Sequence, residues 1–100
     1  MKLIDLVNAR DSLQKLVAQD LPIRTAYELV NLTDECNRHL VFYGGELAKF
    51  DPVKDPERLK ELDNMEVDID AERITISLDG DLKLSAGDVK MLMPLLDFQN

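Results

Sequence analysis

The sequence has no tryptophan, only five aromatic residues and a single cysteine, Cys36. With one cysteine, no disulfide can form within the chain, as is usual for proteins of a reducing compartment. No stretch approaches the roughly 20 apolar residues of a membrane-spanning helix, and Asp5 interrupts the apolar N-terminus. We therefore expect a cytoplasmic protein without membrane contact, and an aliphatic core.

Positive charge is also scarce. Twelve Lys and Arg residues stand against twenty Asp and Glu, so the net charge is −8, and the basic residues form no cluster. A phosphate backbone would be repelled by this balance, which argues against direct binding of nucleic acid. An acidic surface suits a basic protein partner, for example an enzyme that binds nucleic acid. The alternative is that the charge only keeps a small domain soluble.

The first half of the chain predicts an antiparallel helical hairpin over residues 1–50. Apolar residues recur at helical spacing over residues 2–19 and again over 22–49, and the connection at Asp20-Leu21-Pro22 is short. Gly44-Gly45 interrupts the second pattern, but we expect the helix to continue through it.

The second helix carries two apolar stripes, so more than one of its sides should be covered. One stripe contains Ile23, Ala26, Tyr27, Val30 and Val41. From the other stripe we predict a self-association surface that would form a homodimer, and its residues are Leu29, Leu32, Leu40, Tyr43 and Leu47.

The second half predicts a mixed arrangement. Asp51 to Asn64 should form a loop and a short helix that begins at Asp55-Pro56. Apolar and polar residues alternate over 65–70 and 73–78, and Asp79-Gly80 signals a turn before Leu82 and Leu84. Residues 65–84 are therefore expected to form an antiparallel element of two or three strands. A C-terminal helix over 85–97 completes a single α+β domain, residues 1–100.

No constellation of residues indicates catalysis. Cys36 and His39 lie one helical turn apart, but a zinc site needs about three or four protein ligands, and the chain has no other Cys or His. A Cys–His nucleophile pair or a Ser-His-Asp triad would have to use the same His39, without an evident orienting group. We predict no catalytic residue, no metal site and no cofactor.

An acidic row is the one charged feature with a regular pattern. Glu66, Asp68, Asp70 and Glu72 fall on one face of an expected strand. Four like charges in a row require water or cations opposite them. We predict that the row binds a basic partner; the alternative is a solvated strand face.

The opening MKLIDLVNARDSLQKLVAQDLPIRTAYELVNL resembles a group of small phage- and prophage-encoded proteins. The similarity covers a Leu-rich first helix, a DLPIRTAY-like junction and an LSAGDV-like helix start, over residues 1–50 and about 62–98. It brings no functional residues. With the acidic row, this context leads us to predict a non-enzymatic phage-type protein, in the host cell cytoplasm, that binds and modulates a host protein. The alternative is a small virion accessory protein that self-associates through its long helix.

Overall fold

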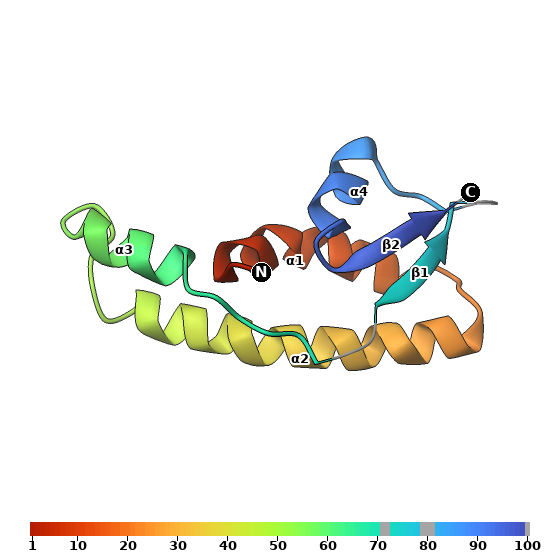
Figure 1. Cartoon of the computed structure of the whole chain (residues 1–100), viewed down its shortest axis with the longest axis horizontal. Coiled ribbons are helices and arrows are strands. Elements are labelled where there is room, and N and C mark those ends of the chain that lie inside the picture. Colours follow the sequence, from red (N-terminus) through yellow and green to blue (C-terminus); the bar gives the residue numbers. More distant parts are fainter. Residues whose placement is uncertain (71–72, 79–81, 100) are drawn as a thin grey trace.

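Two helices joined by a short connection form the N-terminal half of the chain. In the computed structural model, which describes residues 1–70, 73–78 and 82–99, helix α1 (Leu3–Val17) and helix α2 (Ile23–Leu47) run in opposite directions (Figure 1). The predicted hairpin is thus confirmed, and α2 continues through Gly44-Gly45. Leucines of α1 pack against Leu29, Leu32 and Cys36 of α2 in one core.

The remaining elements all lie on one side of α2 (Figure 1). They are helix α3 (Pro56–Asp63), strand β1 (Ile74–Ser77), helix α4 (Ala86–Leu92) and strand β2 (Leu96–Gln99). Helix α1 contacts both α2 and α4, so it is the central element of the core. The predicted α+β class is confirmed.

Helices α3 and α4 both begin at the capping residues that the sequence predicted. The Asp55 carboxylate accepts the backbone N–H of Arg58 at 3.2 Å, with Pro56 at the first helical position. Ser85 and Asp88 form a reciprocal capping box: each side chain accepts the backbone N–H of the other at 3.1 Å.

The sheet differs from the prediction because its two strands are parallel. Ile74 pairs with Leu96 and Ser77 with Gln99. Helix α4 lies between the strands in sequence and provides the crossover that parallel pairing requires. Strand β2 comes from residues expected to be helical up to 97. Helix α4 stops before Pro94, and beyond it Leu96 is buried while Asp97 is exposed.

The other expected strands are not formed. Residues 65–69 make only an isolated antiparallel bridge, between Glu66 and Lys2, and Leu82 and Leu84 lie outside any strand. The segment from 65 pairs instead with residues 1–3, and the backbone groups of the two short stretches satisfy one another. The expected turn at Asp79-Gly80 and the junction at 71–72 lie outside the described residues.

Candidate functional site

The acidic row lies on an extended segment beside the N-terminus. The Leu3 N–H donates to the Met65 carbonyl at 2.8 Å, and the Val67 N–H donates to the Met1 carbonyl at 2.9 Å. These bonds hold the segment extended, so successive side chains point to opposite sides. Val67 is buried, whereas the side chains of Glu66, Asp68 and Asp70 are exposed. Glu72 lies outside the described residues.

The carboxylates of the acidic row differ in whether a positively charged group lies beside them. A Glu66 oxygen lies 3.3 Å from the N-terminal ammonium group of Met1. Among residues 1–70, 73–78 and 82–99, Asp68 and Asp70 have no ion-pair partner. The backbone N–H of Asp70 donates to a Glu35 carboxylate oxygen at 2.6 Å, which ties the end of the segment to α2. Two exposed carboxylates of this segment, those of Asp68 and Asp70, are thus without a neutralising partner in the described part of the chain.

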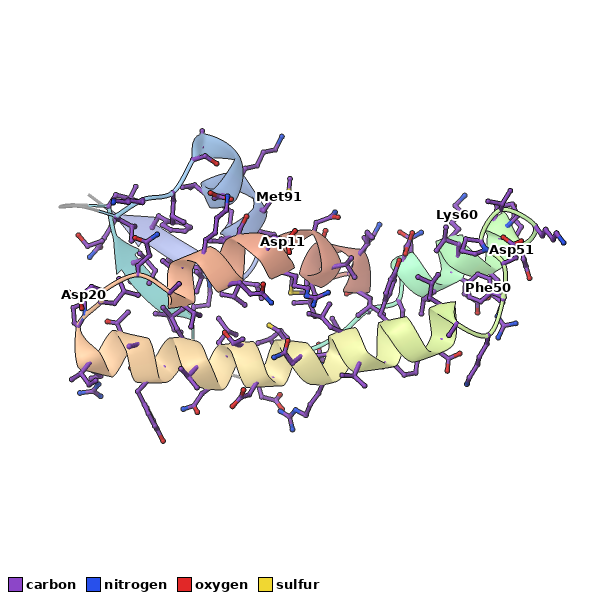
Figure 2. The ribbon with its side chains drawn as sticks, turned by 180° about the vertical axis from the view of Figure 1, so that it is seen from behind. Asp11, Asp20, Phe50, Asp51, Lys60 and Met91 are labelled. Atoms are coloured by element: carbon purple, nitrogen blue, oxygen red, sulfur yellow. The ribbon has the colours of Figure 1, made fainter. Side chains whose placement is uncertain are left out.

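An apolar groove adjoins this surface at the end of the molecule where α2 meets α3. It contains Phe42, Phe50, Leu62 and Met65, and its rim contains Glu46, Arg58 and Glu61. Figure 2 shows Phe50 at this end, beside α3. The Arg58 guanidinium lies 4.8 Å from the centre of the Phe50 ring, a cation–π contact. Met65, which lines the groove, directly precedes Glu66 in the chain, so the groove ends where the acidic segment begins. Sequence reasoning missed the groove, because only the packing of α3 creates it.

The stripe predicted for self-association faces the chain's own core. Leu29 and Leu32 are buried, so the folded chain does not offer them to a second copy. Leu40, Tyr43 and Leu47 are partly buried and pack against the same core. The Tyr43 hydroxyl donates to Asp63 of α3 at 2.8 Å. Burial, with this hydrogen bond and the Asp63 charge, raises the pKa of Tyr43 to about 12.

The outward stripe of α2 is the one left exposed. Of its apolar residues, Ile23, Tyr27, Val30 and Val41 lie in solvent. The sequence contains both stripes, but which one is covered depends on where α1, α3 and the 65–70 segment pack. The sequence of α2 alone therefore does not determine which of its two stripes is covered.

Cys36 lies in an environment that suits packing. It is buried in the core, and burial, together with the nearby Glu35 charge, raises the pKa of its thiol to about 11. The protonated thiol is neither a ready nucleophile nor a ready metal ligand. Among the described parts of the chain, no three His, Cys, Asp or Glu side chains are grouped to hold a metal ion.

A buried polar contact joins α1 to α4, and sequence reasoning missed it. The Ser12 hydroxyl donates to Asp88 at 2.7 Å, and the Lys15 ammonium lies 3.3 Å from the same carboxylate. The Ser12 bond, followed by the Ser85 backbone N–H, then the Ser85 hydroxyl and Lys15, lowers the pKa of Asp88 to about 2 against a smaller opposing effect of burial. Through these partners, Asp88 attaches α4 to α1 and also caps the first turn of α4.

The comparisons with known proteins identify no relative. The chain matches no protein-family model, no curated protein and no solved structure. Within the described residues, no helix has the length and apolar character needed to cross a membrane. The resemblance to phage proteins therefore remains a prediction.

Proposed function

We propose that this chain is a non-enzymatic, phage-type interaction protein that binds a host protein through an acidic surface and modulates it. The surface consists of Glu66, Asp68 and Asp70 together with the groove that adjoins Met65. The observation that supports the proposal is the exposure of these three carboxylates on one side of a segment fixed by backbone hydrogen bonds. Because the segment is already ordered, binding would cost little conformational entropy.

The expected partner surface is basic and carries at least one apolar side chain. Lys and Arg side chains would approach the acidic segment, while an apolar residue would enter the groove beside Phe42 and Met65. Both groove side chains are more than two-fifths exposed, at 44% and 42%. Buried apolar anchors supply most of the affinity of an interface, while charges steer association and select the partner. A host enzyme with a basic groove fits this description.

The test is an affinity capture from bacterial lysate with the triple variant Glu66→Ser, Asp68→Ser, Asp70→Ser beside the unchanged chain. Recovered proteins are identified by mass spectrometry at low and high salt. We expect the unchanged chain to recover one protein in stoichiometric amount at low salt. The triple variant should lose it, and so should the unchanged chain at high salt, because exposed charge pairs are screened.

A matched control changes three exposed carboxylates elsewhere: Asp11→Ser, Asp20→Ser, Glu57→Ser. It alters the net charge by the same amount and should keep the partner. Equal recovery by the triple variant at low salt would exclude the acidic segment as the binding surface. Equal losses in the triple variant and the control would mean that only total charge matters.

A virion accessory protein that self-associates through its long helix is the second candidate. The exposed apolar stripe of α2 favours it, since monomeric proteins seldom leave such a stripe in water. This candidate predicts a stable homo-oligomer and no stoichiometric host protein in the same capture. The two functions are separated by whether a stoichiometric host protein is recovered, because a homo-oligomer is compatible with both.

A further inference from the structure

The outward face of α2 carries a regular, mostly apolar stripe that none of the described elements covers. Ile23 is 87% exposed, Tyr27 69% and Val41 75%. Positions 23, 27, 30, 34, 37, 41, 44 and 48 follow one another at alternating steps of four and three, and all eight are exposed. This is the spacing of a helix that packs along a second helix.

The whole molecule exposes more surface than its mass requires. Its accessible surface is 6769 Å², whereas a folded monomer of 11.4 kDa exposes about 5,800 Å². Its radius of gyration is 14.8 Å, against about 13 Å for a compact chain of this length. A stable interface removes about 800 Å² from each partner. The excess is therefore of the size that one such interface would bury.

We propose that α2 packs antiparallel against α2 of a second copy, with the two-fold axis beside the midpoint between Glu35 and Cys36. Every position of the stripe then faces a position equally far from that midpoint. The facing pairs are Ile23 with Ala48, Tyr27 with Gly44, Val30 with Val41, and Asp34 with Asn37, each pair occurring twice by symmetry.

The shapes of the facing residues complement one another. The first half of the stripe carries the large side chains of Ile23 and Tyr27, and the second half carries Gly44 and Ala48. A Cβ atom added at Gly44 would meet nothing within 4 Å in the chain itself, so the space beside the glycine is open. The Tyr27 ring of the second copy can lie across it. This assigns a purpose to a glycine that weakens an exposed helix by about 1 kcal/mol relative to alanine.

The charges near the axis are also complementary. Asp34 comes level with Asn37 and Arg38 of the second copy. Within the described parts of its own chain, neither Asp34 nor Arg38 has an ion-pair partner. The antiparallel pair thus forms two symmetric Asp34–Arg38 contacts.

A parallel pair is disfavoured by the same residues. It would place Tyr27 on Tyr27, leave Gly44 opposite Gly44 with an unfilled gap, and set Asp34 against Asp34. Like charges and voids at facing positions disfavour an arrangement. The stripe is therefore self-complementary in one direction only.

Cysteine cross-linking tests the direction of packing. Val30→Cys and Val41→Cys are prepared as separate proteins and mildly oxidised, alone and mixed. We expect a covalent dimer from the mixture and none from either protein alone, since like positions lie about 16 Å apart along the axis in an antiparallel pair. A disulfide dimer from either protein alone would overturn the antiparallel arrangement. The native Cys36 is buried in every sample.

Sedimentation equilibrium tests the dimer itself. The unchanged chain should show twice the single-chain mass, and Gly44→Gln or Val41→Gln should weaken the dimer at least about tenfold. The control is Val53→Gln, which removes an even more exposed valine from the loop before α3. A single-chain mass at every concentration, or equal weakening by Val53→Gln, would overturn the proposal. The experiment uses no host protein, so its result is independent of host-protein binding through the acidic surface, whereas a single-chain mass would also remove the self-associating virion candidate.

Discussion

Ser12 is a polar residue on the buried side of α1, surrounded by leucines of the core. A buried hydroxyl without a partner would cost free energy, and Ser12 avoids this cost by donating to Asp88 at 2.7 Å. Asp88 in turn accepts from the Ser85 backbone and from Lys15. One carboxylate therefore begins α4 and also attaches it to α1.

The lowered pKa of Asp88 predicts a dependence of stability on pH. A carboxylate with a pKa of about 2, below its ordinary value of 3.8, stabilises the fold fully above about pH 4. This stabilisation is lost as the pH falls from 4 towards 2, because the unfolded chain takes up the proton first. Ser12→Ala should lower the melting temperature by several degrees near neutral pH. In Asp88→Asn, the melting temperature should fall less steeply as the pH drops below 4.

Thermal unfolding followed by circular dichroism between pH 2 and 6 checks this. The control is Asp11→Asn, which removes an exposed carboxylate from the same helix, and it should leave the acid dependence in place. An acid dependence in Asp88→Asn as steep as that of the unchanged chain would show that other carboxylates cause it.

At the scale of elements, the helices were predictable and the sheet was not. The start of α3 at Asp55-Pro56 and of α4 at Ser85 follows from capping chemistry within four residues, which a sequence displays directly. The pairing of Ile74 with Leu96 joins distant residues across a helix. Strand β2 has four residues, too few for alternation to stand out from a helical pattern.

In the candidate site, too, the features set by neighbouring residues were predictable, and the features set by packing between distant elements were not. The alternation of Glu66 and Asp68 with Val67 predicted the exposed carboxylates, since it is a local pattern. The groove beside Met65 depends on how α3 packs on α2, and the covered stripe of α2 depends on α1. Neither arrangement can be predicted from a pattern of neighbouring residues in the sequence.

The edge of the sheet depends on Arg73, which predicts the effect of a conservative change. Its guanidinium donates to Asp97 at 3.0 Å and to three carbonyls, those of Met93, Pro94 and Leu96. A lysine ammonium cannot reach these acceptors together. Arg73→Lys should lower the free energy of unfolding by about 1 kcal/mol in urea, a value kept small because the side chain is half exposed.

Hydrogen exchange of the β2 amides should become faster in Arg73→Lys, while the amides of α1 should exchange as before. The control is Arg24→Lys, since within the described part of the chain Arg24 makes a single ion pair, the exposed one with Glu28. Equal effects of the two changes would show that the four contacts of Arg73 contribute no more than a surface charge pair.

At the scale of the whole molecule, two surfaces lie on different sides of α2. Glu35 receives the acidic segment on one side of the helix, whereas Tyr27 and Val41 are exposed on another. Figure 2 shows that side chains also extend from this helix on the side away from the other drawn elements. Binding at one surface does not block the other. A dimer would present two copies of the acidic surface to its partners, which increases apparent affinity for a partner with two sites.

The two surfaces should respond in opposite ways to salt. Each copy carries a net charge of −8, so two copies repel each other, and salt screens that repulsion. The interface itself is mostly apolar, and its Asp34–Arg38 contacts are a minor part. Salt should therefore preserve or strengthen the dimer, whereas it should weaken the capture of a basic partner.

If α2 forms the dimer, folding and association are coupled, so the melting temperature should rise with protein concentration. The rise should persist at high salt and should disappear in Val41→Gln, while Val53→Gln should keep it. Differential scanning fluorimetry across a wide range of concentration, at low and high salt, measures it. A melting temperature that is the same at every concentration would mean that α2 keeps its apolar stripe in water, and the excess surface of the monomer would then have to serve a different protein.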